Sequence, residues 1–335
     1  MHPGNQLFVR TLGEVSVSAG GEMLPLTGGR EYALLVYLAW IRSRVTRESI
    51  ADLLWPSGDR SRRLHSLSQL VYRLGRSLPR GILLATKSEL ALRSQLVTLD
   101  AYELRSAAEA GRYRDALELC TGEFLPEFVV RDAPAFDHWR EQVSTELRRL
   151  TGIVLRELVP EFERTGEWVR LHGALDRLIE DNPGDLELHR RQIRALLLQG
   201  DRAEAHARHR RYAQRLATVE QRADVDQLTN EIEKYAEIPE PLRAVDPALR
   251  TRLLGRRVEQ DTLRSELALA LRGRSRFVEV IGTAGLGKSR LLEHFGRYCI
   301  LHGVRVLAGR CHPGGRQLPY SGIESILMSL DGSDV

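Results

Sequence analysis

Residues 282–289, GTAGLGKS, combine three glycines, a lysine and a serine at a spacing that can hold phosphate groups. The glycines let backbone N–H groups close round the phosphates, the lysine reaches the β and γ phosphates, and the serine can hold Mg²⁺. A helix that starts here adds its dipole. The motif predicts a nucleotide site with ATP and Mg²⁺ as candidate cofactors, and a structural glycine turn is the alternative. The candidate ligands are Gly282, Gly285, Gly287, Lys288 and Ser289, with Ser289 holding the Mg²⁺.

The elements around this loop decide what it can do. Phe277–Ile281 is apolar and predicts a buried strand, and a helix is predicted after the loop. Hydrolysis also needs an acidic residue on a second strand. The only candidate, Asp331, follows the stretch YSGIESILMSL, which we interpret as a helix. We therefore expect no enzymatic activity, and a lobe with so little sheet would have an open edge that argues even against nucleotide binding.

Positive charge is concentrated in one short part of the chain. Arg60–Arg93 contains eight Arg or Lys residues and a single acid, Glu89, whereas the whole chain has a formal net charge of only +4. A local excess of this kind is typical of a nucleic-acid footprint. On charge alone, a solvated basic face explains the segment equally well.

Residues 61–79, SRRLHSLSQLVYRLGRSLP, predict an amphipathic helix within this basic segment. Leucines and a valine at 64, 67, 71, 74 and 78 share one face, and Arg, Ser and Gln residues repeat on the other. Arg and Gln side chains suit the major groove of DNA, because they can pair with guanine and adenine and can reach phosphates. Together with the hairpin that follows, the candidate DNA contacts are Arg62, Arg63, Ser66, Gln69, Arg73, Arg76 and Lys87.

The elements on either side of this helix give it a recognisable context. Leu7–Val17 has strand composition, residues 28–44 predict a buried helix, and residues 46–56 predict a second helix with Thr46 as N-cap. After the basic helix, GILLAT and LALRS predict a hairpin that includes Lys87. The order strand, helix, helix, basic helix, hairpin is that of a winged helix-turn-helix.

From Asp100 to about Tyr235 the composition is rich in Leu, Ala, Glu and Arg, and a weak repeat of 34 residues is visible. GEWVRLHGALDRL aligns with GDRAEAHARHRRY, so that Leu171 falls on Ala205 and Leu178 on Tyr212. A period of 34 with helix–turn–helix content resembles tetratricopeptide repeats, in which each helix pair buries its apolar face against its neighbour.

Other features exclude several classes of protein. The apolar runs are far shorter than the roughly 20 residues that a membrane helix needs, and the N-terminus lacks the pattern of a signal peptide. Three separated cysteines without CxxC spacing favour a reducing cytoplasm and no structural metal. The histidines of the repeat region, including the pair His206 and His209, lack acidic or Cys partners and are interpreted as helix surface.

The stretches REYALLVYLA, TRESIADLLWP, SQLVYRLGRSL and VTLDAYEL resemble the Streptomyces antibiotic regulatory protein family of transcription activators. The resemblance implies an OmpR-type winged helix in residues 1–98 and a helical bacterial transcriptional activation domain in residues 99–236. It also implies binding to tandem repeats in promoter DNA, alone or as a homodimer, and recruitment of RNA polymerase.

The end of the chain resembles the signal-transduction ATPases found in large members of that family, through LLGRR, GTAGLGKSR, VLAGRC and LPYSGIESIL. In such ATPases the arginine matched by Arg256 lies near the adenine. A linker with three prolines is expected at 237–250, followed by the first part of a P-loop lobe at 251–335. The expected fold is thus multidomain and mainly α, with a winged helix, a tetratricopeptide-like domain and a partial α/β lobe.

Two other functions remain open from the sequence. The chain is a signal-transduction NTPase if it shows turnover that depends on Lys288. It is a protein-binding scaffold if the basic helix has only a structural role.

Overall fold

The computed structural model describes residues 6–26, 28–199, 201–215 and 256–309, with single positions between 225 and 233 and at 323, 326 and 327. The chain divides into two compact units, Met1–Leu158 and Val159–Val335. No helix among the described residues is long and apolar enough to cross a bilayer.

Two small sheets frame the first unit. The first has the order β3-β2-β1-β7, with β1 parallel to β7 and antiparallel to β2, and the second has the order β4-β6-β5. The strands are β1 (Leu7–Arg10), β2 (Ser16–Ala19), β3 (Glu22–Met23), β4 (Val45–Thr46), β5 (Leu83–Ala85), β6 (Glu89–Leu92) and β7 (Val97–Leu99).

The single strand expected over Leu7–Val17 is wrong, because this segment contains β1 and the start of β2, which are separate strands. The chain bends between them at Gly13, whose φ is +75°. A side chain there would be strained, and its Cβ would lie 3.0 Å from the carbonyl oxygen of Thr121. Residues on both sides of Gly13 have strand composition, which is why the sequence predicted a single strand.

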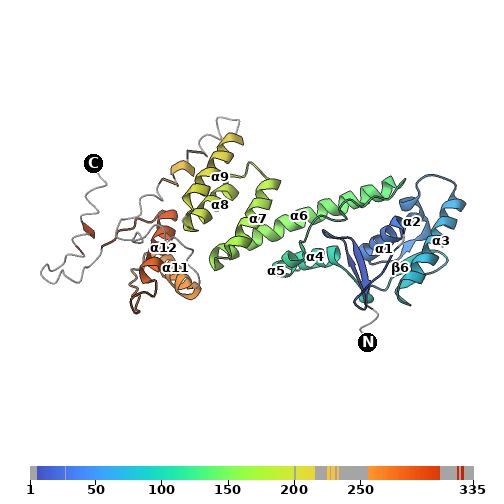
Figure 1. The fold of residues 1–335 in the computed structure, drawn as a ribbon, viewed down its shortest axis with the longest axis horizontal. Helices are drawn as coiled ribbons and strands as arrows, with labels where there is room; N and C mark the ends of the chain where they lie inside the picture. The colour runs from blue at the N-terminus through green and yellow to red at the C-terminus, as the bar shows by residue number, and fades with distance from the viewer. Residues whose placement is uncertain are drawn as a thin grey trace. The chain divides into compact units, whose positions relative to one another are not determined.

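The helices predicted for the winged helix-turn-helix are confirmed. The Thr46 hydroxyl accepts a hydrogen bond from the backbone N–H of Ser49 and caps the second helix, as expected. Asp59 caps the third helix in the same way through the N–H of Ser61. Figure 1 shows these helices together, with β6 beside the first. They are α1 (Gly29–Ile41), α2 (Arg47–Leu54) and α3 (Arg60–Ser77).

The wing is also confirmed: β5 and β6 form the antiparallel hairpin expected from GILLAT and LALRS. Its second strand pairs with β4, which immediately precedes α2. The wing is therefore tied by backbone hydrogen bonds to the start of the second helix.

The rest of the first unit packs directly on the winged helix. The carboxylate of Asp100, the first residue of α4, accepts hydrogen bonds from the N–H groups of Thr11 and Leu12 at 2.8–2.9 Å. Trp139 packs edge-on against Tyr37 of α1, with ring centroids 5.1 Å apart. The helices involved are α4 (Asp100–Glu109), α5 (Tyr113–Leu119) and α6 (Pro134–Thr165), with a short 3-10 turn, η2 (Ser94–Leu96), before β7.

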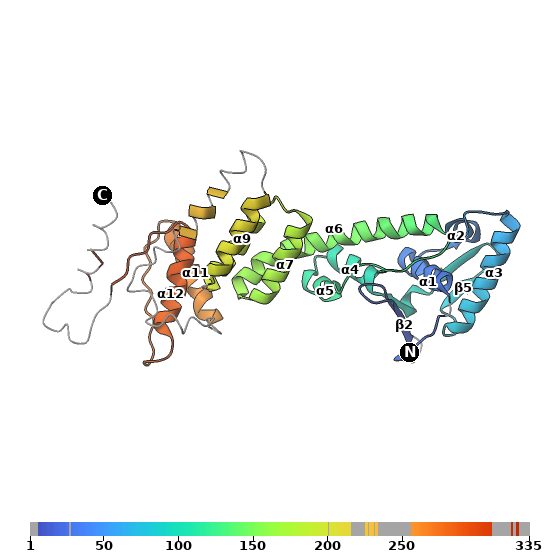
Figure 2. The ribbon, with the colours of Figure 1, turned by 45° about the horizontal axis from the view of Figure 1, so that its top comes forward.

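In the second unit, successive helices stack in antiparallel pairs, and the repeat read from the sequence is confirmed by burial. At most 1% of the surface is exposed at each of the aligned positions, which are Leu171 with Ala205 and Leu178 with Tyr212. Figure 2 shows α7 and α9 in this stack, with α11 and α12 side by side. The helices are α7 (Trp168–Asp181), α8 (Leu186–Gln199), α9 (Arg202–Arg215), α11 (Arg257–Leu271) and α12 (Lys288–Leu301).

The strand expected at Phe277–Ile281 is absent, so this prediction is wrong. Residues 277–281 have no strand geometry in the structure, and the side chains of Phe277 and Ile281 are 91% and 81% exposed. A strand needs a neighbour for its backbone hydrogen bonds, and no strand is found elsewhere in residues 256–309. The helix expected after the loop is present as α12.

Some expectations lie outside the described residues. These are the linker at 237–250, Asp331, Cys311 and most of the helix expected at residues 320–330.

Candidate nucleic-acid interface

Helix α3 is held by one apolar face. Leu67, Val71, Leu74 and Leu78 are buried as predicted, Leu64 is half-buried, and Leu70 joins the buried face although it was not predicted there. These five buried side chains fix the helix against the rest of the domain, and the opposite face of the helix is exposed to solvent.

The exposed face of α3 carries a straight stripe of three polar side chains. Arg62, Gln69 and Arg76 are seven residues apart, which is two helical turns, and all three are exposed. The side chains of Arg62 and Arg76 form no ion pair with any residue that the structure describes. His65 and Tyr72 lie beside the stripe, and the Nε2 atoms of His65 and Gln69 are 2.9 Å apart. The stripe is about 21 Å long at 1.5 Å per residue.

Three of the predicted contacts occupy different surroundings. The guanidinium of Arg73 pairs with Glu31 of α1, and that of Arg63 pairs with Asp52 of α2. Ser66 is half-buried, so it lies on the flank of the helix rather than opposite the apolar face. These residues are not brought together with the stripe.

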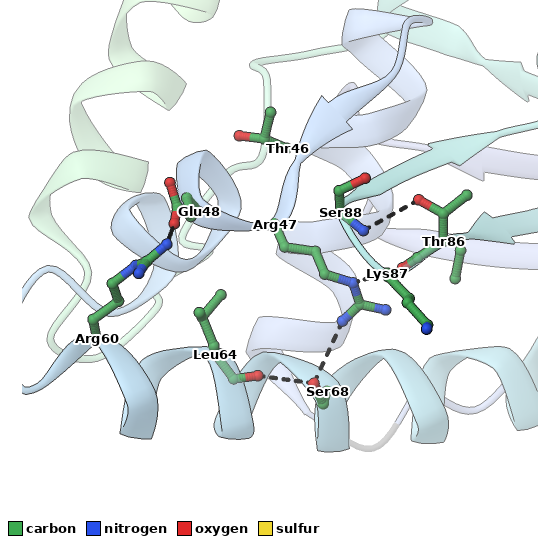
Figure 3. A pocket seen from close by; sticks show the side chains of 10 residues that line it. Thr46, Arg47, Glu48, Arg60, Leu64, Ser68, Thr86, Lys87 and Ser88 are labelled. Atoms are coloured by element: carbon green, nitrogen blue, oxygen red, sulfur yellow. Dashed lines mark hydrogen bonds and ion pairs between the residues drawn. The ribbon is translucent and has the colours of Figure 1, made fainter.

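A groove of about 920 Å³ separates α3 from the wing. Arg47, the first residue of α2, reaches across it: its Nε donates to the carbonyl of Thr86 at 2.9 Å, and Nη1 contacts Ser68 Oγ at 3.4 Å. Figure 3 shows Arg47 directed towards Ser68 of α3, with Lys87 at the turn of the wing. Lys87 thus lines the same groove as α3, as expected for a wing residue.

Arg47, Arg60 and Ser68 of this groove were not named as DNA contacts in the sequence analysis. Arg47 was read only as part of a helix start, and Ser68 lies on the side of α3 towards the wing. Arg47 directly follows the capping Thr46, so its positive charge lies at a helix N-terminus and opposes the helix dipole. This unfavourable position could have indicated that the Arg47 side chain has a role outside the helix. Arg60 also lines the groove and pairs with Glu48.

The phosphate loop of the second unit is formed around Lys288. The Lys288 ammonium donates to the carbonyls of Gly282 and Thr283 at 2.7 and 2.8 Å. Gly285 and Gly287 have φ values of +84° and +74°, which the glycines at those positions permit. The guanidinium of Arg256 donates to the carbonyl of Leu286, so this predicted nucleotide contact does lie beside the loop. Ser289 is the second residue of α12.

Comparisons with known proteins bear on both parts of the chain. Residues 91–233 match the bacterial transcriptional activator domain, and residues 252–331 match the AAA ATPase domain. No curated protein matches the sequence. Among solved structures, the chain is similar to Mycobacterium tuberculosis EmbR in complex with a low-affinity phosphopeptide. That similarity has a TM-score of 0.46 and 18% identity, and it covers 81% of this chain and 72% of the other.

The first of the two matches begins within β6, at the end of a winged helix whose elements the structure describes from β1 to β7, and the second match follows it. Their order is the one expected from the resemblance to the Streptomyces antibiotic regulatory proteins. The chain therefore contains a bacterial transcriptional activator domain at residues 91–233 and an AAA ATPase domain at residues 252–331, as the resemblance to that family predicted.

Proposed function

We propose that the chain is a sequence-specific activator that binds direct repeats in promoter DNA through α3 and the wing. The observation that carries this proposal is the exposed stripe Arg62–Gln69–Arg76 on a helix whose other face is buried. The activator-domain match supports RNA polymerase as the second partner. Such a regulator acts in the cytoplasm, and binding in tandem or as a homodimer fits promoter repeats.

The length of the stripe suggests that its three side chains contact different parts of the DNA. The major groove is about 12 Å wide, whereas the stripe extends over about 21 Å. Gln69 at its centre is therefore placed to read a base, and Arg62 and Arg76 at its ends are placed to contact phosphates on either side. Lys87 and Arg47 at the wing add further phosphate contacts.

Selection of binding sites from random duplex DNA at physiological salt tests this function. We expect enrichment of a direct repeat whose units lie about one helical turn apart. Gln69→Ala should relax the sequence preference at one position, whereas Arg76→Ala should weaken binding to all sequences and reduce the salt slope by about 0.9. Recovery of no consensus would contradict the proposal and favour the protein-binding scaffold.

We also propose that the loop around Lys288 binds ATP with Mg²⁺ without hydrolysing it. The match to the AAA ATPase domain and the position of Arg256 beside the loop support a nucleotide site. Equilibrium dialysis with labelled ATP and Mg²⁺ tests it: binding should be lost in Lys288→Ala and retained in Arg257→Ala, a matched exposed cation one residue after Arg256. Steady phosphate release that disappears in Lys288→Ala would instead identify an NTPase.

A further inference from the structure

Tyr72 is an exposed aromatic residue of α3 to which none of the DNA contacts proposed above assigns a role. It is 67% exposed, and it forms no hydrogen bond, ion pair or ring contact with any residue that the structure describes. Its ring is the largest apolar group on the exposed face of this helix. Packing of the ring against a partner would remove apolar surface from water, which is favourable.

Tyr72 lies next to Gln69 on the part of α3 that points away from the core of the winged helix. The buried face of the helix consists of Leu67, Leu70, Val71, Leu74 and Leu78. At about 100° per residue, Gln69 and Tyr72 lie within about 40° of the direction opposite that face, one on each side of it. Arg73, whose spacing predicted a DNA contact, lies about 60° from that direction. Tyr72 therefore points outward more directly than Arg73 does.

An open hollow of about 430 Å³ lies beside the Tyr72 ring, and it is lined by Ser68, Gln69, Tyr72 and Arg73. Two of these side chains are already engaged within the protein. The Ser68 hydroxyl donates to a backbone carbonyl at 2.9 Å, and Arg73 Nε donates to Glu31 at 2.9 Å. Gln69 and the Tyr72 ring therefore remain as the groups of this hollow that can contact a base pair.

The spacing of these two residues matches the stacking of base pairs. Tyr72 follows Gln69 by three residues, a rise of about 4.5 Å along the helix axis. Base pairs are stacked about 3.4 Å apart, so the two side chains reach neighbouring base pairs. Among the base edges in the major groove, only thymine presents an apolar group, its C5 methyl. The Tyr72 ring therefore fits a thymine beside the base that Gln69 contacts.

We propose that Tyr72 is a specificity-determining residue that packs against the C5 methyl of a thymine, in the base pair next to the one that Gln69 reads. This inference rests on the proposed function, because it requires α3 to lie in the major groove. It places a thymine at a fixed distance from the Gln69 position in each promoter repeat. Removing one methyl group from such a contact weakens binding about fourfold, the value for one buried carbon.

Replacement of single thymines by deoxyuridine tests the contact, because uracil differs from thymine only in lacking the C5 methyl. The probe is the duplex selected from random DNA, with each thymine replaced in turn, and the protein is the full chain at physiological salt. We expect one replacement in each repeat unit to weaken binding about fourfold and the others to leave it unchanged. The affected thymine should adjoin the position at which Gln69→Ala relaxes the preference.

The outcomes separate this inference from the proposed function. A consensus with no thymine beside the Gln69 position, or no penalty for deoxyuridine at any position, would overturn the role of Tyr72 and leave the proposed function intact. Recovery of no consensus would overturn both.

Three variants distinguish the methyl contact from other roles of Tyr72. Tyr72→Ala should bind the thymine and deoxyuridine duplexes equally, whereas Tyr72→Phe keeps the ring and should keep the penalty. Arg76→Ala, which removes a neighbouring exposed side chain, should weaken binding to both duplexes and also keep the penalty. A penalty that persists in Tyr72→Ala would assign the methyl contact to another residue, and loss of the penalty in Tyr72→Phe would make the hydroxyl, rather than the ring, the contacting group. Either result would overturn the proposal.

Discussion

Arg73 of α3 donates through Nε to Oε1 of Glu31 in α1 across 2.9 Å, and the Glu31 side chain is only 3% exposed. The arginine itself remains 61% exposed. A residue predicted as a DNA contact therefore also neutralises a carboxylate in the core of the winged helix. Loss of DNA binding on its removal would by itself not distinguish a lost contact from a destabilised domain.

The pair predicts a stability defect in Arg73→Ala. The Glu31 carboxylate would lose its charged partner in a buried position, and we expect the free energy of unfolding to fall by about 1–3 kcal/mol. Arg76→Ala, one turn away and exposed, should change it by less than about 0.5 kcal/mol. Urea unfolding of both variants measures the difference. Recovery of stability in the double variant Glu31→Gln, Arg73→Ala would confirm the cause, and equal stability of the two single variants would contradict it.

Arg47 is predicted to position the wing. Its Nε bond to the Thr86 carbonyl holds the wing turn next to α3. Arg47→Ala should speed amide exchange in residues 83–92 and weaken DNA binding about five- to tenfold, equivalent to about 1–1.4 kcal/mol. Arg44→Ala is the control, because its pair with the wing residue Glu89 is 3.6 Å long and its side chain is 72% exposed. Unchanged exchange in Arg47→Ala would show that the hairpin holds itself.

Gly122 is predicted to be essential for the close approach of the N-terminal sheet to the loop after α5. A Cβ at this position would lie 2.5 Å from Cα and 2.9 Å from N of Gly13, so the backbone would have to shift. Gly122→Ala should cost about 1–3 kcal/mol. Gly152→Ala, within α6, meets nothing within 4 Å and should stabilise by up to about 1 kcal/mol. Thermal unfolding of the two variants should therefore shift in opposite directions, and a shift in the same direction would refute the packing explanation.

The second unit should lose stability in acid through His294. Burial, together with Arg264 and Arg297, lowers the pKa of His294 from 6.5 to about 4. Between pH 6.5 and pH 4 the unfolded chain therefore binds a proton at His294 that the folded chain does not bind. The contribution of His294 to the free energy of unfolding is complete above pH 6.5 and is lost as the pH falls towards 4. The total is roughly 3 kcal/mol.

Unfolding free energies of wild type and His294→Leu at pH 7 and pH 4.5 measure this contribution. The wild type should lose about 2–3 kcal/mol more than the variant over that interval. An identical loss in both proteins would assign the acid sensitivity to other groups.

Several features of this protein followed from the sequence because they depend on residues close together in the chain. The period of α3 placed Leu67, Val71 and Leu74 on a buried face, and Thr46 was recognisable as a cap. The 34-residue repeat aligned Leu171 with Ala205 because each repeat packs in the same way on its neighbour. The glycines around Lys288 marked the loop, since its conformation is local.

Other features were decided only by tertiary structure, because they depend on which distant groups meet. Phe277–Ile281 is apolar enough for a strand but has no strand beside it among residues 256–309, and a strand requires a partner for its backbone groups. Arg73 was indistinguishable from Arg76 by spacing, yet only Arg73 faces the buried Glu31. Leu197 of α8 and Leu301 of α12 likewise share one buried cluster although they are more than 100 positions apart, and no periodicity within either helix could predict their approach.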